Sequence, residues 1–169
     1  MAKSLLRSDN EIAEIYQRHV KTVYRVCYTY LKNHADTEDT VADTFVKMIK
    51  AAPAFESEEH EKAWLIRTAA NGCKDFLKHW WRRNAYDIGG EDVANYSDTL
   101  DAETSFEGDS LLEAVCGLPE KYKAVIHLYY YEGYTSVQIA GVLRKPQSTI
   151  RSYLSEARAI LRTKLGGDF

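Results

Sequence analysis

Apolar side chains in the first half of the chain recur every three or four positions, which is the spacing of one face of an amphipathic helix. This pattern predicts a helix over residues 9–32, a second helix that ends before Pro53, and a third helix after a polar loop. Residues 33–36 between the first two helices indicate a turn, with Asp36 or Thr37 as the N-cap of the second helix. The side chains expected to face the interior are Ile12, Ile15, Tyr16, Val20, Val23, Tyr24, Cys27, Tyr30, Leu31, Val41, Phe45, Met48, Ile49, Trp64, Leu65, Ala69, Cys73, Phe76 and Leu77.

A second set of helices, shorter than the first, is predicted near the C-terminal end. Apolar residues at 111–116 predict one helix, and Pro119 suits the first position of the next. That helix is expected to reach about Tyr131 and to end at Gly133, because glycine readily adopts the backbone angles that follow a helix end.

Two further helices joined by a tight turn are predicted after Gly133. Thr135 and Gln138 have the spacing of a capping box that opens a short helix through Leu143, and residues 144–146 indicate a turn. The helix that follows has an apolar face and a polar, basic face, which is the helix-turn-helix pattern of DNA-binding proteins. The apolar face contains Ile150, Leu154, Ala157 and Leu161. The polar face contains Ser148, Thr149, Arg151, Ser152, Ser155 and Arg158.

Between the two sets of helices, residues 86–109 lack periodicity and are rich in acidic and small polar residues, which is typical of a flexible linker. We therefore expect an all-α protein with two small helical domains, residues 1–85 and 110–169, joined by this linker. The net charge of −3 conceals a block pattern, because residues 86–110 hold eight acidic and no basic residues while the sequence on either side has a basic excess. The overall charge therefore does not exclude a nucleic-acid partner for either domain.

Sequence motifs argue against several functional classes. There is no phosphate-binding glycine loop, no Gly-x-Ser-x-Gly nucleophile elbow, and no His-Glu-x-x-His or Cys-x-x-Cys pattern. The three cysteines, at positions 27, 73 and 116, have neither zinc nor disulfide spacing and fit a reducing cytoplasm. There is also no secretion signal and no apolar run long enough to span a membrane. We therefore expect a cytoplasmic protein without catalytic activity, cofactor, metal or membrane insertion.

The end of the third predicted helix combines aromatic and basic residues. Such a mixture suits unpaired DNA, because aromatic rings stack on exposed bases while cations hold the backbone. This stretch contains Lys74, Lys78, His79, Trp80, Trp81, Arg82 and Arg83. Trp64 and Phe76 fall on the inward stripe, and we interpret them as core residues. Trp80 and Trp81 are adjacent and cannot both face the core, so one of them is expected to point outward.

Three stretches of the chain resemble a known protein family. Residues 114–165 resemble the C-terminal DNA-binding domain, region four, of extracytoplasmic-function (ECF) sigma factors, including Leu-Pro-Glu at 118–120 and Glu-Gly at 132–133. Residues 37–49 look like region 2.2 of the same family, and residues 61–83 look like regions 2.3 and 2.4. The order and spacing of these stretches also resemble those of the family.

The resemblance implies a sigma factor that binds core RNA polymerase, recognises the minus-ten and minus-thirty-five elements of promoter DNA, and promotes melting. The last helix would read the minus-thirty-five element through its polar face, with Arg151 and Ser152 as the leading candidates for base contacts. The acidic linker would follow the RNA path of the polymerase, and an anti-sigma factor is an expected partner. Polymerase-binding residues implied by the resemblance are Asp36, Asp39, Asp43 and Lys47. Minus-ten residues suggested by the resemblance and the aromatic-basic stretch are Phe55, His60, Asn71, Lys74, Lys78, Trp80, Trp81, Arg82 and Arg83.

Two residues of the second domain depart from the family pattern, and a third is unfavourable for DNA binding. Arg144 and Pro146 occupy turn positions where the family usually has glycine and serine. A positive φ at Arg144 would cost about 1 kcal/mol, and Pro146 cannot supply a hydroxyl cap. Glu156 would repel DNA phosphates unless its carboxylate accepts a hydrogen bond from a cytosine amine or pairs with an arginine.

Two alternatives to a polymerase subunit remain open from the residues alone. A stand-alone helix-turn-helix regulator would bind a palindromic operator without polymerase, because symmetric dimers select symmetric half-sites. A pure interaction module held by an anti-sigma partner would have no promoter activity. A run-off transcription assay separates the three hypotheses.

Overall fold

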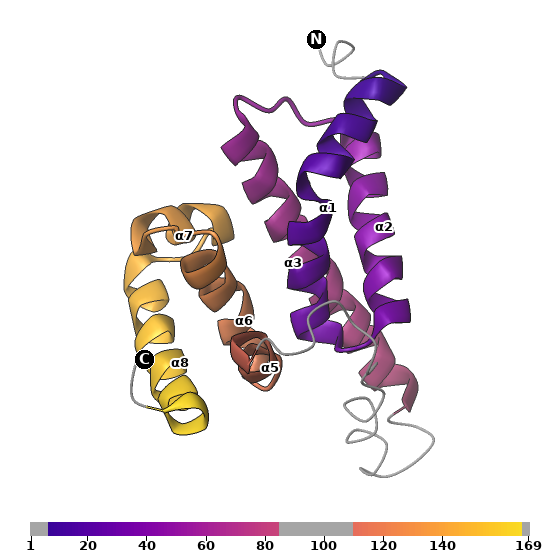
Figure 1. The fold of residues 1–169 in the computed structure, drawn as a ribbon. Helices are drawn as coiled ribbons and strands as arrows, with labels where there is room; N and C mark the ends of the chain where they lie inside the picture. Colours follow the sequence, from indigo (N-terminus) through magenta and orange to yellow (C-terminus); the bar gives the residue numbers. More distant parts are fainter. Residues whose placement is uncertain (1–6, 85–109, 167–169) are drawn as a thin grey trace. The chain divides into compact units, whose positions relative to one another are not determined.

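The chain forms two compact units, residues 1–100 and 101–169. The computed structural model describes residues 7–84 and 110–166, and every regular element within these ranges is a helix (Figure 1). This confirms the predicted all-α class. None of the helices in these ranges combines the length and the apolar character needed to cross a membrane. The predicted acidic linker, residues 86–109, lies outside the described residues.

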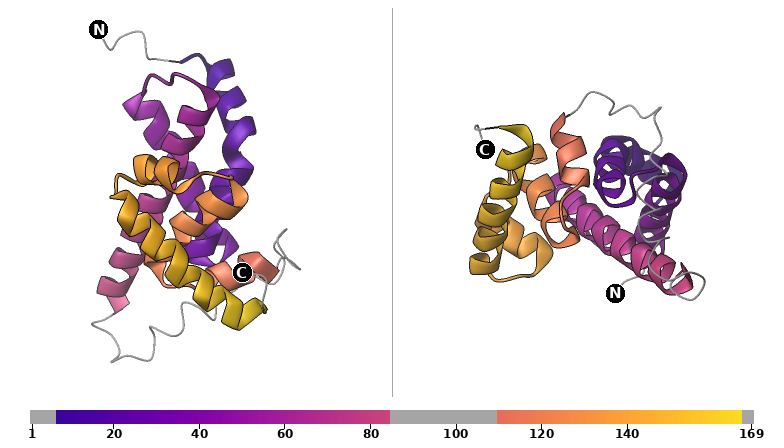
Figure 2. Two further views of the ribbon diagram at one scale, coloured as in Figure 1. Left: turned by 90° about the vertical axis from the view of Figure 1, so that its left-hand side faces the viewer. Right: turned by 90° about the horizontal axis from the view of Figure 1, so that it is seen from below.

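Three long helices form the first unit. Helix α1 covers Asp9–Leu31, α2 covers His34–Ala51 and α3 covers Glu58–Asn84. Each packs against the other two, with α2 antiparallel to α1 and α3, and the three lie side by side in the further views of Figure 2 as well. Burial of apolar side chains between them stabilises the unit by about 25 cal/mol per Å² removed from water. The largest fully buried side chains of this core are Tyr30, Leu31, Met48, Leu65 and Ile66.

The starts of α1 and α2 are capped by side chains. Ser8 forms a capping box with Glu11 at the start of α1. The Oδ1 atom of Asn33 accepts a hydrogen bond from the backbone N–H of Asp36 at 2.9 Å, so Asn33 is the N-cap of α2. The expected cap at Asp36 or Thr37 is therefore wrong. The chain reverses direction within two residues of the end of α1, and α2 consequently begins earlier than the sequence suggested.

Most of the side chains expected to face the interior are buried, but several are not. Tyr16 and Ile49 are 44% and 42% exposed, and Trp64, Phe76 and Leu77 are only half-buried. In a three-helix bundle the two neighbours cover only a stripe of each helix, so apolar residues at the margin of the stripe stay accessible to water. The 27-residue α3 is also longer than the 18-residue α2, and its C-terminal end extends beyond α2 (Figure 1). Half-burial was also found for Ile12, Val20 and Tyr24.

The second unit consists of shorter helices packed against α8. Helix α5 covers Ser110–Cys116, α6 covers Glu120–Ile126, α7 covers Ser136–Leu143 and α8 covers Gln147–Leu165. A π-helical turn, η3, covers His127–Tyr131 and continues α6. Helix α8 packs against α5, α6 and α7, which places it along one side of the unit (Figure 1). The largest fully buried side chains are Leu112, Ile126, His127, Leu128, Ile139, Ile150 and Leu161.

The helix-turn-helix of the second unit has the predicted bounds. Thr135 and Gln138 form the predicted capping box, and α7 ends at Leu143 as expected. Pro119 is not the first helical residue but the N-cap of α6, because its ψ of 145° is extended. Four apolar residues of α8 are buried as predicted, namely Ile150, Leu154, Ala157 and Leu161.

The turn between α7 and α8 contains the two unusual residues. Arg144 has a φ of 56° and ends α7 in the left-handed region. Pro146 precedes α8 and makes no side-chain cap bond. Both structural features agree with the sequence analysis, so this turn forms without the glycine and the hydroxyl cap.

Candidate nucleic-acid interface

The outer face of α8 carries the polar residues that the sequence predicted for DNA contact. Serine hydroxyls both donate and accept hydrogen bonds, and arginine suits guanine edges and phosphates. The exposed members of the predicted set are Ser148, Arg151, Ser152 and Ser155, and the half-buried members are Thr149 and Arg158. Short side chains dominate the exposed part of this face, so α8 can approach the floor of a groove closely.

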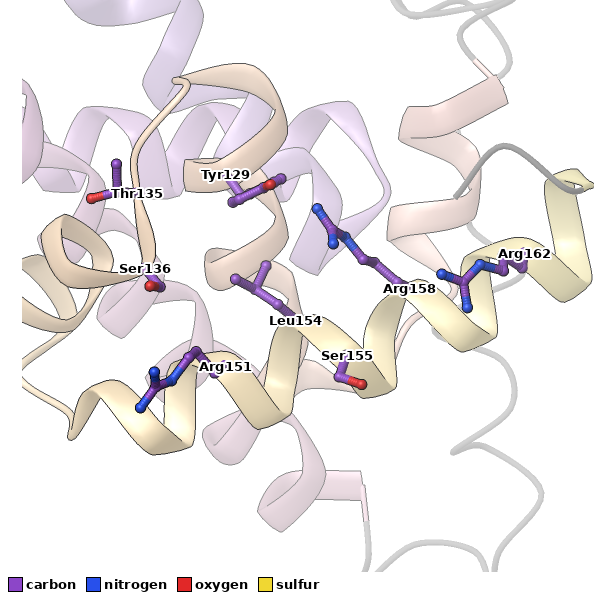
Figure 3. A pocket seen from close by; sticks show the side chains of 8 residues that line it. All are labelled: Tyr129, Thr135, Ser136, Arg151, Leu154, Ser155, Arg158 and Arg162. Carbon is purple, nitrogen blue, oxygen red and sulfur yellow. The ribbon is translucent and has the colours of Figure 1, made fainter.

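A pocket of about 470 Å³ opens between α8 and the first turn of α7 (Figure 3). Arg151, Arg158 and Arg162 follow one edge of α8, because spacings of seven and four residues return to the same side of a helix. Thr135 and Ser136 line the opposite wall at the start of α7, where the helix dipole is positive. Within the described ranges, no carboxylate pairs with these three arginines. The pocket therefore suits a phosphate group.

Arg158 is held against two tyrosines of η3. Its Nε donates a hydrogen bond to the hydroxyl of Tyr130 at 3.0 Å, and its guanidinium carbon lies 4.8 Å from the centre of the Tyr129 ring. The hydrogen bond to Tyr130 raises the pKa of Arg158 above its ordinary value, so the group stays charged. Cation–π contacts of this kind also restrict a guanidinium to one position. Arg158 is thus a fixed charge in the pocket wall. The sequence had suggested instead a side chain that faces outward.

Glu156 is engaged by residues of α6. The hydroxyl of Tyr122 donates a hydrogen bond to Oε2 of Glu156 at 2.5 Å. The ring of Tyr122 meets Tyr153 edge to face, and Nζ of Lys121 lies 5.0 Å from the centre of the Tyr122 ring. The partners expected from sequence were a cytosine amine or an arginine. The structure instead gives the carboxylate a tyrosine donor, with a lysine close to both groups.

The last turns of α3 carry the aromatic and basic residues predicted to hold unpaired DNA. Trp81 is 41% exposed and Trp80 is half-buried, which confirms that one of the two points outward. Their rings meet edge to face with centroids 5.7 Å apart. Among the other predicted residues of α3, the exposed ones are Asn71, Lys78, Arg82 and Arg83, and Lys74 is half-buried. This end of α3 therefore presents one accessible indole among several cations.

The loop between α2 and α3 holds Phe55 in an aromatic cluster. Its ring centroid lies 5.5 Å from that of His60 and 5.9 Å from that of Trp64, both with edge-to-face geometry. The backbone N–H of Glu56 donates to Nδ1 of His60 at 3.1 Å, which fixes the imidazole against the loop. The guanidinium of Arg7 lies 4.8 Å from the centre of the Phe55 ring. The structure thus brings together Phe55 and His60, as expected, with two residues that the sequence did not assign to this site.

The outer face of α2 carries the residues implied in polymerase binding. Asp39, Asp43 and Lys47 are exposed at four-residue spacing, and Asp43 and Lys47 form an ion pair of 3.2 Å. Asp36 is half-buried, and its Oδ2 accepts a hydrogen bond from Nδ2 of Asn33 at 2.9 Å. Asp36 therefore contributes to the helix cap, while the other three side chains are accessible to a partner.

Polar side chains around the buried Glu61 tie helices of the first unit together. Nη1 of Arg18 and Nε2 of His19 each lie 2.7 Å from Oε1 of Glu61, which joins α1 to the first turn of α3. Pairing of this kind is needed because a buried carboxylate without a partner would destabilise the fold. Across residues 7–84 and 110–166, no group of three or more histidine, cysteine or carboxylate side chains is arranged to hold a metal ion.

Several residues at these sites escaped the sequence analysis. Arg162 lies one helical turn beyond Arg158, so its spacing alone could have placed it in the same row. Tyr129 and Ser136 reach the pocket only through the contacts of η3 tyrosines with Arg158 and the packing of α7 on α8. Arg7 reaches Phe55 across 48 positions of sequence, and no local pattern signals such a contact.

Comparison with known proteins identifies relatives of both units. The Sigma-70 region 2 family model matches residues 15–83, and the Sigma-70 region 4 family model matches residues 108–161. The ECF RNA polymerase sigma factor SigW of Bacillus subtilis is 26% identical over 96% of this chain and 94% of its own length. The ECF RNA polymerase sigma-E factor of Haemophilus influenzae is 29% identical over 94% of this chain and 84% of its own length.

Two solved structures have a similar fold. The sigma factor RpoE in complex with the anti-sigma factor NepR from Bartonella quintana has a TM-score of 0.69 at 19% identity, over 94% of this chain and 99% of that one. CnrH in complex with the cytosolic domain of CnrY has a TM-score of 0.66 at 21% identity, over 99% of this chain and 96% of that one. The likeness to these structures shows the fold. The family is shown by the matches to both sigma-70 regions and by the relatives that align over most of their length. The chain belongs to the sigma-70 family and is an ECF RNA polymerase sigma factor.

Proposed function

We propose that this sigma factor binds core RNA polymerase in the cytoplasm and directs it to promoters through two separate DNA contacts. Residues 1–85 form the domain for the minus-ten element, residues 110–169 form the domain for the minus-thirty-five element, and the acidic segment 86–109 links them. The observation that carries the proposal is the arginine row of α8 beside the start of α7, within a helix-turn-helix (Figure 3). The polymerase supplies the catalysis of RNA synthesis.

At the minus-thirty-five element, α8 enters the major groove with two kinds of contact. Arg151 and Ser152 are exposed and contact base edges, where arginine pairs well with guanine. Arg158 and Arg162 contact phosphates, because Arg158 is fixed at the side of the helix by its tyrosine contacts. Hydroxyls that complete the interface belong to Ser148, Thr149 and Ser155.

At the minus-ten element, the first unit holds melted DNA. Phe55, His60 and Asn71 receive an extruded base, which the aromatic cluster of the loop supports. Trp81 offers an exposed ring for stacking, and Trp80 backs it from the side. The cations that hold the DNA backbone are Lys74, Lys78, Arg82 and Arg83.

Partner proteins use other surfaces. Asp39, Asp43 and Lys47 on α2 bind the polymerase, with Asp36 at the margin of this surface because it also serves the helix cap. An anti-sigma factor controls the protein. The sigma factor RpoE, which has a similar fold, was solved in complex with the anti-sigma factor NepR, and CnrH, also of similar fold, was solved in complex with the cytosolic domain of CnrY.

Run-off transcription tests the proposal directly. Purified protein with core RNA polymerase is expected to start transcription at a defined promoter, and altering either promoter element should reduce the product. Protein alone should bind duplex DNA weakly. Polymerase-independent binding to a palindromic site, or no initiation on any of a library of promoters, would contradict the proposal.

A further inference from the structure

The segment that precedes α1 contacts the loop between α2 and α3 through one arginine. Nη2 of Arg7 donates a hydrogen bond to the backbone carbonyl of Pro53. The guanidinium of the same side chain lies 4.8 Å from the centre of the Phe55 ring. Arg7 therefore contacts both Pro53 and Phe55, in a short loop that lies 46 to 48 positions away in sequence.

These two contacts act on the part of the loop that determines where Phe55 lies. The loop leaves α2 at Ala52, which has a φ of 44°, and Pro53 follows directly. His60 and Trp64 contact Phe55 edge to face. Arg7 adds a cation over the ring and a bond to the backbone two residues earlier, so both the ring and the backbone that carries it are held.

We propose that Arg7 is a positioning residue, which holds Phe55 ready to receive an unpaired minus-ten base. This inference rests on the minus-ten function proposed above for Phe55. A loop held in its binding conformation before DNA arrives avoids the entropic cost of ordering a side chain on binding, which is about 0.5–1.5 kcal/mol. Arg7 itself acts through Phe55 and does not read the base.

Four variants separate positioning from charge. Arg7→Ala removes both contacts, and Arg7→Lys keeps the charge but loses the planar fork that stacks and bonds at once. Lys21→Ala is the matched control, because it removes one positive charge from an exposed site on α1. Phe55→Ala removes the ring through which Arg7 is proposed to act.

The measurement is the affinity of the holoenzyme for single-stranded minus-ten oligonucleotides. At each position in turn, an oligonucleotide with the base is compared with one that has an abasic site, and the ratio of the two affinities is the base preference at that position. In the wild type, one position should show a preference for the base. Arg7→Ala should reduce that preference about two- to tenfold, which corresponds to the ordering cost of one side chain. Arg7→Lys should fall between, and Lys21→Ala should leave the preference unchanged. Arg7→Ala combined with Phe55→Ala should lose no more preference than Phe55→Ala alone.

Three outcomes would overturn the inference. Equal weakening of base-containing and abasic oligonucleotides by Arg7→Ala and Lys21→Ala would assign Arg7 to general attraction of phosphates. A stronger base preference in Arg7→Ala would mean that the guanidinium occupies the place of the base. If the wild-type holoenzyme shows no base preference at any position, the proposed minus-ten function fails, and the inference about Arg7 falls with it.

Discussion

At the scale of single residues, Glu156 shows how an acidic side chain on a helix proposed to bind DNA can be paired within the protein itself. An exposed carboxylate on a groove-binding helix repels phosphates unless another group balances it. Here Tyr122 donates a hydrogen bond to the carboxylate, and Lys121 lies against the same tyrosine ring. The pair joins α6 to α8, so Glu156 has a structural partner before any DNA is bound.

The Tyr122–Glu156 contact predicts a specific pH dependence. The hydrogen bond to Glu156, followed by burial, raises the pKa of Tyr122 above its ordinary value of 10.0. A raised pKa in the folded state means that the contact stabilises the protein fully below pH about 10 and is lost as the pH rises further. The wild type should therefore lose thermal stability more steeply than Tyr122→Phe as the pH rises above about 10. Identical slopes in melting experiments across this range would rule out the contact.

The arginines of α8 are expected to differ in their roles. Arg151→Ala should weaken discrimination at one base of the minus-thirty-five element by about 1–3 kcal/mol. Arg158→Ala should weaken binding to all sequences alike. It should also reduce, by about 1, the slope of the logarithm of affinity against the logarithm of salt concentration. Competition binding of promoter variants to the holoenzyme at several salt concentrations measures both. A change of sequence preference in Arg158→Ala would show that it reads a base.

At the scale of elements, three helices end on residues that are not glycine although the backbone is left-handed. Lys32, Ala52 and Arg144 end α1, α2 and α7 with φ of 62°, 44° and 56°. Left-handed geometry costs a residue with a side chain roughly 1–2 kcal/mol. None of these three positions carries the glycine that usually marks a left-handed helix end.

Arg144 offers a direct test of this strain. Arg144→Gly should raise the free energy of unfolding by about 1 kcal/mol, because glycine adopts the left-handed region without steric cost. Lys145→Gly is the control. Its φ is not positive, so this change should lower stability by increasing the freedom of the unfolded chain. Chemical denaturation monitored by circular dichroism measures both, and equal effects of the two changes would contradict the argument.

The π-helical turn η3 is the element that the periodic pattern did not reveal. The backbone N–H of Glu132 bonds to the carbonyl of His127 at 3.3 Å, so one extra residue fits into the turn. The turn places Tyr129 and Tyr130 beside Arg158, with their ring centroids 5.0 Å apart. An uninterrupted α-helix to Tyr131 was expected, and the wider turn is what builds this wall of the pocket.

At the scale of the whole molecule, the proposed function depends on charges that face different partners. The surface proposed to bind the polymerase, on α2, is mainly acidic, whereas the surfaces proposed to bind DNA, on the last turns of α3 and on α8, are basic. Complementary charges of this kind guide each surface to its own partner and repel the wrong one. Because opposite charges lie on separate surfaces, a net charge of −3 does not exclude DNA binding.

Reversing the acidic surface provides the test at this scale. Asp39→Lys combined with Asp43→Lys should reduce affinity for core polymerase at least about tenfold, because like charges then oppose each other at the contact. Glu113→Lys combined with Glu120→Lys is the control, because it changes the net charge equally at exposed positions of the other unit. Circular dichroism should report an intact fold in both. Unchanged polymerase affinity would move the contact away from α2.

Local physics determined much of this protein from sequence alone. Helical periodicity predicted the long helices and the helix-turn-helix, because burying one face of a helix requires apolar residues every three or four positions. The capping box at Thr135 and Gln138 fixed the start of α7, since it depends on neighbouring residues only. The polar face of α8 was visible for the same reason.

Tertiary structure decided the features that depend on distant residues. The exposure of Tyr16 and Ile49 follows from how much of each helix its neighbours cover, and the contact of Arg7 with Phe55 joins segments 48 positions apart. The arginine pocket likewise needs α7, η3 and α8 to pack together. A residue's own neighbours in sequence set its secondary structure, but burial, charge pairing and pocket walls are set by side chains that only folding brings near.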